Sequence, residues 1–326
     1  MEKFLKNNLV SVCITTYNRQ EQLPLTLKSV LKQTYKNLEI IIVDDYSNDG
    51  TKDLIKNKLL KLDKRIKYIR HKKNRGLAEA RNTAINNAKG KYFAFCDDDD
   101  LWDSKFVKEF LKVASNYNRY WCFCCSEKKK YFSNKKIQIN FEFEGSLKKF
   151  IKKGYTPPVA AQFYNLSILK DIRGYNKKIK VGIDHDLWIR LAKADIKIKY
   201  IPKALSIPNS NHTQKRITTN YSQRMSGIKD TLKIWKKDLI LMYGKKFYTK
   251  FYNAYLFREQ QKFIKISLKT FNISQIYKIL RNFSITSFLN IVFVSLIKIT
   301  FNKFIFKIFS EKKKIENIKP TLIIKN

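Results

Sequence analysis

The chain has 326 residues, of which 44% are hydrophobic and 14% aromatic. A hydrophobic fraction of this size can build a large core, which excludes a generally disordered protein, and the length favours one large α/β domain with an appended region. The formal net charge of +40, from 67 Lys and Arg against 27 Asp and Glu, predicts an anionic partner: nucleic acid, an acidic membrane surface or a phosphate-bearing substrate.

Cysteine and histidine content limits the redox and metal chemistry of the chain. Five cysteines lie mostly in apolar strand-like runs, and their spacing matches neither a secreted disulfide framework nor a paired CxxC zinc site. With only three histidines, a zinc cluster is not expected. The N-terminal run "MEKFLKNNLVSV" has no long apolar stretch of the signal-peptide type. We therefore expect reduced thiols in a cytosolic protein.

The first hundred residues alternate between strand and helix patterns. Short β-rich runs predict strands at 9–14, 38–43, 66–69 and 91–96. Apolar residues at helical spacing predict helices between these strands, the last of them the Ala-rich segment 76–88. This alternation predicts a parallel sheet with right-handed crossovers, in which ligands bind beyond the carboxyl ends of the strands.

Beyond residue 103 the alternation loosens. The sequence predicts strands at 120–126 and 135–143 around a turn at 133–134. Residues 156–164 form an extended, proline-containing entry to another strand, and 184–194 are expected to be helical.

The C-terminal part differs in composition, with 17 Lys and Arg against 3 acidic residues from 245 to 326. The uncharged stretch 282–297 is too short and too polar for a transmembrane span. In the segment 301–308, phenylalanine and isoleucine fall on one helical face and lysines on the other, which favours an anionic membrane interface. A helix packed on the domain with its lysines in water is the alternative.

Four consecutive aspartates, residues 97–100, follow the predicted strand 91–96. Carboxylates this close repel one another unless a cation neutralises them or their pKa values rise. Mg²⁺ and Mn²⁺ prefer oxygen ligands and commonly use one or two carboxylates together with substrate phosphates. A solvated acidic turn is the alternative, but the place at a sheet edge just before Trp102 favours a cation site. Asp100 is expected to begin the next helix with Trp102.

Polar loops after the other strands predict a nucleotide site. Asp45 follows the second strand, where a carboxylate can accept hydrogen bonds from a base or from ribose. Thr15 and Tyr17 after the first strand offer a small hydrogen-bonding group and an aromatic face. Gly76 permits close backbone approach, and Arg81 offers a fork for phosphate, with a helix-surface arginine as the alternative. Together these loops predict a nucleotide diphosphate with a metal on its phosphates.

Four segments carry a family resemblance: "VSVCITTYNR", "TLKSVLKQTYKNLEIIIVDDYSNDGT", "NRGLAEARNTAINNAKGKYFAFCDDDDLW" and "DHDLWIRLA". In this order and spacing they resemble a family 2 glycosyltransferase, an inverting sugar transferase with the GT-A fold, over residues 8 to 215. The resemblance implies that residues 1–215 form an α/β domain with a Rossmann-like, mostly parallel central sheet flanked by helices. Residues 216–326 are expected to be a helical, basic, membrane-associating extension.

The resemblance also implies roles for matching positions. Asp97 and Asp99 match the outer members of the Asp-x-Asp motif that binds Mn²⁺ or Mg²⁺, with Asp99 the expected direct ligand. His212 resembles a histidine that approaches the metal or phosphates in some relatives, and a surface-loop histidine is equally compatible. The positions matched to the nucleotide are Thr15, Tyr17, Asp45 on the base, Arg81 near the diphosphate, and Asp98.

The catalytic base is matched to Asp184. The family usually has Glu-Asp there, whereas this chain has Ile183 before Asp184, and Asp186 leaves a second register open. The implied reaction is a direct displacement with inversion, in which the base takes the proton of an acceptor hydroxyl. Metal and Arg81 stabilise the departing nucleoside diphosphate.

The sequence thus predicts a hexosyltransferase-type enzyme that moves a sugar from a nucleotide-diphosphate sugar, UDP-sugar favoured, to a hydroxyl of a glycan or lipid-linked glycan. Bacterial surface polysaccharide or lipooligosaccharide synthesis is the expected setting. We expect the protein in the cytoplasm, peripherally bound to the inner face of the cytoplasmic membrane.

Three alternative classes fit the sequence less well. A metal-dependent nucleotidyltransferase would carry a Gly-rich phosphate loop with a lysine, which "TTYNRQEQ" lacks. A basic nucleic-acid-binding protein would gather basic and aromatic residues on one sheet face, but here the sheet edge is acidic, so no nucleic-acid partner is expected. An inactive scaffold would not need the aspartates matched to base, metal and nucleotide.

Overall fold

The computed structural model describes residues 8–127, 129–130, 136–137, 143–153, 161–208 and 221–269. Within these residues nine strands form the main sheet: β1 Val10–Thr16, β2 Leu38–Asp44, β3 Ile66–Arg70, β4 Tyr92–Phe95, β5 Asp100–Trp102, β6 Trp121–Glu127, β9 Phe143–Ser146, β10 Gln162–Asn165 and β11 Lys197–Pro208. Two further short strands, β7 Lys129–Lys130 and β8 Lys136–Ile137, pair with each other.

The helices are α2 Leu23–Leu31, α3 Thr51–Asn57, α4 Leu77–Asn87, α5 Phe106–Ala114, α6 Leu147–Lys152, α7 Leu166–Asp171, α8 Ile183–Lys193, α9 Tyr221–Tyr243 and α10 Lys245–Lys269, with a 3₁₀ turn at Leu59–Lys61. Each strand and helix predicted in the first hundred residues is present, with bounds shifted by a few residues.

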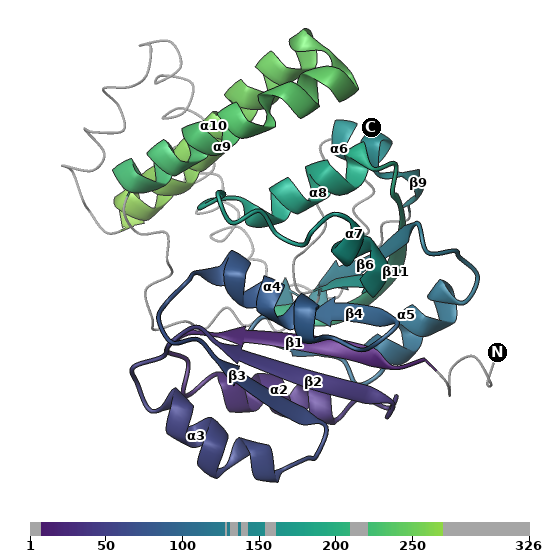
Figure 1. Ribbon diagram of the computed structural model, residues 1–326. Helices are drawn as coiled ribbons and strands as arrows, with labels where there is room; N and C mark the ends of the chain where they lie inside the picture. Colours follow the sequence, from purple (N-terminus) through teal and green to yellow (C-terminus); the bar gives the residue numbers. More distant parts are fainter. Residues whose placement is uncertain are drawn as a thin grey trace, which may run out of the picture. The chain divides into compact units, whose positions relative to one another are not determined.

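The sheet has the order β3-β2-β1-β4-β10-β6-β11-β5, with β9 also paired to β11. The first four strands in this order are parallel, as predicted. Strand β10 is antiparallel to both β4 and β6 and joins the parallel half to a second, mixed half. The predicted α/β architecture with a central sheet flanked by helices is therefore confirmed (Figure 1).

Alternating side chains of the parallel strands divide the core into two layers. On β1, Val10, Val12 and Ile14 pack with α2 and α3 on one face, while Cys13 packs with α4 on the other. Figure 1 shows the same division, with α4 on one side of the sheet and α2 and α3 on the opposite side. Because both faces are covered, β1 and β2 are buried along their whole length, and their carboxyl ends are where polar groups can gather.

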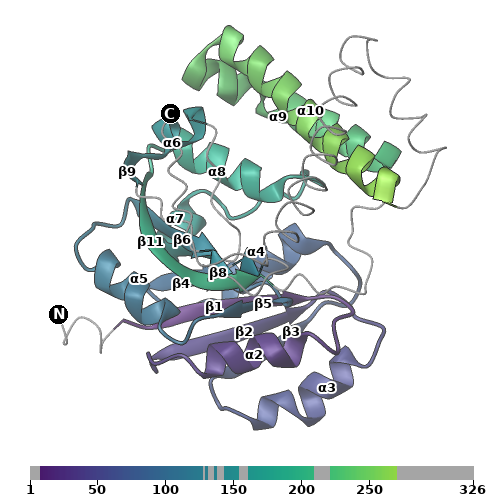
Figure 2. The same ribbon diagram turned by 180° about the vertical axis from the view of Figure 1, so that it is seen from behind.

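Asp100 corrects one expectation. It does not begin the helix after the aspartate run but opens β5, which pairs antiparallel with β11 through Pro208. The following helix, α5, starts only at Phe106. The register between β11 and β6 shifts twice between Ile201 and Ser206, and Figure 2 shows β11 as a strongly bent strand. This bend carries the end of β11 over to the aspartate run.

The chain divides into two compact units, Met1–Tyr252 and Asn253–Asn326. Helix α9 belongs to the first unit, beyond residue 215, and a domain boundary at 215 stays a prediction. No described helix is long and apolar enough to cross a membrane. The stretch 282–297 and the amphipathic segment 301–308 lie outside the described residues. The five cysteines are buried and free, as expected.

Candidate active site

A buried arginine connects two of the predicted site residues. Arg81, from α4, has 1% of its side chain exposed. Its Nη1 donates to Oδ1 of Asp184 at 2.6 Å, and its Nη2 donates to Oδ1 of Asp97 at 2.8 Å. Burial disfavours the charge, but Tyr175, Asp184 and Asp97 hold the pKa of Arg81 well above its ordinary value. The two carboxylates therefore compensate a cation that is otherwise costly to bury.

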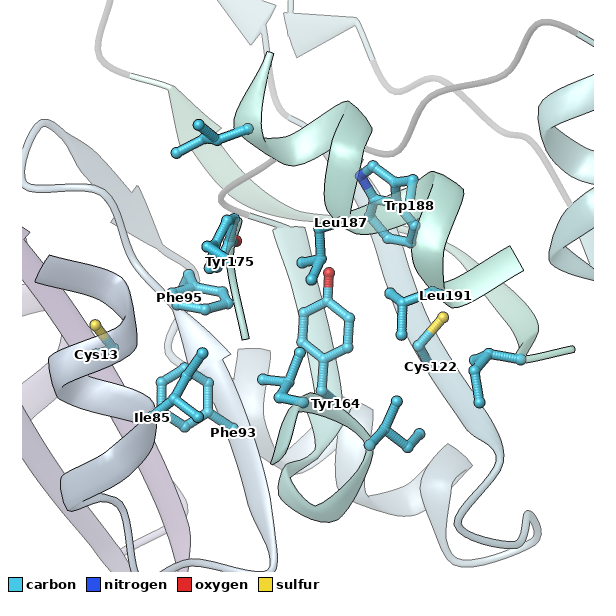
Figure 3. Packing of buried hydrophobic residues seen from close by; sticks show 14 of the residues in the cluster. Cys13, Ile85, Phe93, Phe95, Cys122, Tyr164, Tyr175, Leu187, Trp188 and Leu191 are labelled. Carbon is cyan, nitrogen blue, oxygen red and sulfur yellow. The ribbon is translucent and has the colours of Figure 1, made fainter. Parts of the chain in front are cut away.

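Two aromatic rings fix the plane of this guanidinium. Its central carbon lies 5.2 Å from the ring centroids of both Phe95 and Tyr175. The Tyr175 hydroxyl lies 3.3 Å from Arg81 Nη1 and donates to Asp184 Oδ1 at 3.4 Å. Figure 3 shows the rings of Phe95 and Tyr175 next to each other. The aromatic contacts thus support both the cation and the carboxylate that it binds.

Tyr175 is itself tied to α4. The side chain of Asn82 donates to the carbonyl oxygen of Tyr175 at 2.9 Å and accepts from its N–H at 2.7 Å. Gly174 precedes it with φ of +61°, and a Cβ atom there would lie 2.3 Å from Oδ1 of Asn82. Only glycine satisfies this backbone conformation and this close approach.

Helix α8 brings Asp184 to this place. It begins after Gly182, which has φ of +82°, and presents Leu187, Trp188 and Leu191 to the core. Figure 3 shows these three side chains around Tyr164 of β10. Asp184 lies in the first turn of the helix with 22% of its side chain exposed, so a substrate hydroxyl can approach it.

The aspartate run after β4 is crowded. Asp98 has 13% and Asp99 21% of its side chain exposed, and Arg19 lies 3.9 Å from one and 3.8 Å from the other. Burial raises the pKa of Asp98 to about 7, with Asp99 and Asp97 adding to the shift while Thr16 and Arg19 oppose it. The repulsion expected between adjacent carboxylates therefore contributes to this raised pKa, in addition to burial.

The two aspartates at the carboxyl end of β2 have different partners. Asp44 is fully buried and accepts from Ser47 N at 2.7 Å, Tyr68 Oη at 2.8 Å and Arg70 Nε at 3.2 Å. These contacts hold the loop that follows β2.

Asp45 instead organises the start of α4. It accepts from the backbone N–H groups of Arg75 and Gly76 at 2.8 and 2.7 Å and contacts His71 Nδ1 at 2.7 Å. His71 Nε2 lies 2.8 Å from the hydroxyl of Thr83 on α4. Asp45 therefore connects the ends of β2 and β3 with the helix that carries Arg81.

Thr15 and Tyr17 lie beside this loop. The N–H of Asp45 donates to the carbonyl oxygen of Thr16 at 2.9 Å, so the ends of β1 and β2 adjoin. Thr15 is 7% exposed, whereas Tyr17 is 42% exposed. An exposed aromatic ring at a sheet edge is available to stack on a base.

Of the remaining predicted residues, His212 lies outside the described part of the chain. Asp186, the alternative base, is 2% exposed, and its oxygens accept from Arg190 Nε at 2.8 Å and Trp235 Nε1 at 3.1 Å. Its burial between these donors indicates a structural position. In the part of the chain that the structure describes, no group of three or more His, Cys, Asp or Glu side chains is arranged to hold a metal ion.

Sequence patterns did not single out Arg19, His71 or Tyr175. Arg19 ends the quoted motif "TTYNR", and His71 directly follows β3, so their places in the chain carried a usable signal. Tyr175 lies in a loop with no such signal, and its role depends on contacts made only in the folded chain.

Comparison with known proteins places the chain in a family. The family model described as "Glycosyl transferase family 2" matches residues 11–172. The chain is also 32% identical over 219 residues to an uncharacterized glycosyltransferase of Methanocaldococcus jannaschii, with 64% of this chain and 74% of that protein covered. The chain belongs to glycosyl transferase family 2.

Other curated relatives match this chain over less than half of their own length. An uncharacterized glycosyltransferase of Rickettsia conorii is 37% identical over 216 residues, covering 63% of this chain and 33% of that protein. WfaP of Escherichia coli, a UDP-Glc:α-D-GlcNAc-diphosphoundecaprenol β-1,3-glucosyltransferase, is 44% identical over 119 residues, covering 35% of this chain and 46% of WfaP. The chain spans about a third of the length of the first curated relatives that it matches.

Solved structures show the same fold. TarS of S. aureus in complex with UDP-GlcNAc has a TM-score of 0.60 and 17% identity, covering 86% of this chain and 79% of that one. The mannosyltransferase PcManGT of Pyrobaculum calidifontis, solved with GDP-Man and Mn²⁺, has a TM-score of 0.58 and 16% identity, covering 89% and 80%. The predicted GT-A fold is confirmed by these likenesses.

Proposed function

We propose that this chain is an inverting glycosyltransferase that moves a sugar from a nucleotide-diphosphate sugar to a hydroxyl of a glycan or lipid-linked glycan. The observation that carries the proposal is the contact of Arg81 with both Asp97 and Asp184. One carboxylate follows β4, where a nucleotide sugar binds in such sheets, and the other begins α8. Arg81 thus holds a donor-side carboxylate and a candidate base at one place.

Asp184 is the proposed general base. Its Oδ1 already accepts from Arg81 and Tyr175, so we assign proton transfer from the acceptor hydroxyl to Oδ2. The deprotonated oxygen then attacks the anomeric carbon from the face opposite the leaving nucleoside diphosphate, and the configuration inverts.

The donor's nucleoside is assigned to the loops after β1 and β2. Tyr17 supplies an exposed ring for stacking, and Thr15 supplies a hydroxyl at the end of the preceding strand, β1. Asp45 fixes the backbone of Arg75 and Gly76 and so shapes the wall of this site. We propose Asp45 as the residue nearest the donor's nucleobase. A contact of Arg81 with the diphosphate stays a prediction, because its Nη1 and Nη2 already donate to carboxylates.

The aspartate run fits a divalent cation that arrives with its substrate. Carboxylate oxygens suit Mg²⁺ or Mn²⁺, and one or two of them suffice when phosphate oxygens complete the coordination shell. Asp99 and Asp97 are the proposed ligands, with Asp98 beside the nucleotide and His212 as a further candidate. When bound, the cation would neutralise charge that develops on the departing diphosphate.

UDP-sugars are the favoured donors, and a lipid-linked glycan of a bacterial surface polysaccharide or lipooligosaccharide is the favoured acceptor. Support comes from the E. coli relative, whose name specifies a UDP-sugar donor and a diphosphoundecaprenol acceptor. Such an acceptor would lie at the inner face of the cytoplasmic membrane. The net charge of +40 suits peripheral binding to anionic lipids there, and we assign this binding to residues 216–326.

The donor assignment is tested by measuring nucleotide release from UDP- and GDP-sugars with Mn²⁺ or Mg²⁺ and a diphosphoundecaprenol-linked glycan. Proton NMR of the product gives the configuration at the anomeric carbon. We expect turnover with a UDP-sugar and inversion, and little turnover by Asp99→Ala. Asp171→Asn, which changes a half-exposed aspartate on α7, is the matched control. A retained configuration, or full turnover by Asp99→Ala, would contradict the proposal.

A further inference from the structure

Helix α9 contacts the residues that precede Asp184 and the residues that follow it in the first turn of α8. One face of α9, formed by Gly227, Thr231 and Trp235 at intervals of four residues, lies against residues 181–186. Both α8 and α9 follow the part of the chain that the family model matches, which ends at residue 172. The contacts of α9 with the start of α8 therefore need an explanation of their own.

On the N-terminal side, α9 holds the backbone just before α8. The hydroxyl of Thr231, 3% exposed, shares its hydrogen between the carbonyl oxygens of Val181 at 3.0 Å and Gly227 at 2.8 Å. A Cβ atom at Gly227 would lie 2.9 Å from the side chain of Val181, so the backbone of α9 packs closely on that side chain. Gly182 follows in the left-handed conformation that glycine adopts readily, and α8 begins directly after it.

On the C-terminal side, α9 holds the residues after Asp184. The indole N–H of Trp235, which is 2% exposed, donates to Oδ1 of Asp186 at 3.1 Å. The ring of His185 lies 6.2 Å from that of Trp235. Oδ2 of Asp186 accepts from Arg190, whose Nη1 donates to the carbonyl oxygen of Ile172. The first turn of α8 is therefore fixed on both sides of Asp184.

We infer that Thr231 and Trp235 are positioning residues that act through this turn to hold Asp184 against Arg81. The inference rests on the proposed role of Asp184 as the base. A carboxylate in the first turn of a helix moves with that turn, and a displacement of about an ångström can lower a catalytic rate by roughly 100-fold. Helix α9 is then part of the catalytic domain and not a spacer between it and the C-terminal region.

Two substitutions remove the hydrogen bonds and keep most of the packing. Trp235→Phe deletes the indole N–H, and Thr231→Val deletes the hydroxyl at nearly constant volume. Trp121→Phe on β6 and Thr249→Val on α10 are the matched controls. Trp121 packs on Tyr117, and Thr249 makes a similar bond to its own helix, but neither is found in contact with residues 181–186 among the described residues.

The full-length protein is tested in two ways. Hydrogen–deuterium exchange should rise at residues 183–186 in both α9 variants and stay unchanged in both controls. In the transfer assay, kcat should fall roughly 10- to 100-fold in the α9 variants while KM for the donor and the affinity for UDP stay within about twofold. Unchanged exchange, or increased exchange with wild-type kcat, would overturn the inference.

The same data separate this inference from the proposed function. If the wild-type protein transferred no sugar from any donor, the proposed function would be wrong, and exchange at residues 183–186 would still decide whether α9 fixes this turn. A parallel loss of kcat, UDP affinity and folded protein in the α9 variants, but not in the controls, would indicate general destabilisation and overturn the positioning role.

Discussion

The buried Arg81 forms an ion pair with the partly exposed Asp184, with Nη1 2.6 Å from Oδ1, although 103 positions separate them in the chain. The second half of the same guanidinium binds Asp97. One planar cation therefore sets the distance between the carboxylate after β4 and the carboxylate that begins α8. A monodentate cation would not hold both carboxylates in this way.

Arg81→Lys tests the need for this fork. Lysine keeps the charge but cannot donate to two carboxylates in one plane, so we expect kcat to fall about 100-fold. The free energy of unfolding should fall by about 3 kcal/mol, because one buried ammonium leaves one of the two carboxylates without its donor. Steady-state kinetics and urea denaturation measure the two effects. Arg75→Lys, in an exposed pair with Glu79, should change stability by less than about 0.5 kcal/mol. Equal losses of kcat and stability in both variants would show that the two contacts of Arg81 with carboxylates are not required.

Asp45→Asn tests the organisation of the nucleotide loops. Asp45 accepts from two backbone N–H groups and contacts His71, and an amide NH₂ in place of one oxygen would face a donor with a donor. We expect the Kd for UDP, measured by calorimetry, to rise at least about tenfold, equivalent to about 1.4 kcal/mol. Asp49→Asn, which changes an aspartate whose bond to Gln20 N is exposed, is the control. UDP affinity equal to that of the wild type would show that Asp45 does not shape the site.

Gly174→Ala tests the connection between α4 and Tyr175. The new Cβ atom would require positive φ and would collide with Asn82, so the bonds between Asn82 and Tyr175 should break. We expect a loss of stability above the roughly 1–3 kcal/mol of backbone strain alone. Gly145→Ala is the control, because it also has positive φ but no atom of the described residues lies within 4 Å of its added Cβ. Equal decreases in melting temperature for the two variants would contradict this account.

Glu39 predicts a pH dependence of stability. Its side chain on β2 is 6% exposed, and although burial raises its pKa, Lys67, Ser11 and the N–H of Lys89 together hold the pKa below its ordinary value. A depressed pKa contributes stability above the unfolded-state value of about 4.3, and that stability is lost as pH falls through the folded-state value. Urea midpoints of wild type and Glu39→Gln should therefore differ at pH 7 and converge below about pH 4. A difference that stays constant on acidification would contradict the assignment.

Much of the fold and of the site's edge could be predicted because the signals are local. The apolar runs of β1 to β4, and the polar residues at their ends, are read within single segments of the chain. Since carboxyl ends of parallel strands meet at one sheet edge, Thr15, Asp45 and Asp97 could be placed together without any tertiary contact.

The remainder depends on pairing between distant segments. Asp100 opens a strand because β11 bends over to meet it, and its own neighbours in sequence give no sign of this. The pairing of Arg81 with Asp184 and the contact of Trp235 with Asp186 likewise arise from packing of α8, which no local pattern specifies. Tyr175 was missed for the same reason.

Sugar transfer by Asp184→Asn tests the central claim most directly. Asparagine keeps the shape of the side chain but cannot take up the acceptor's proton, so kcat should fall by roughly 10²- to 10⁴-fold while the affinity for UDP stays at the wild-type value. Transfer at the wild-type rate by this variant, with folding and UDP binding intact, would show that the base lies elsewhere.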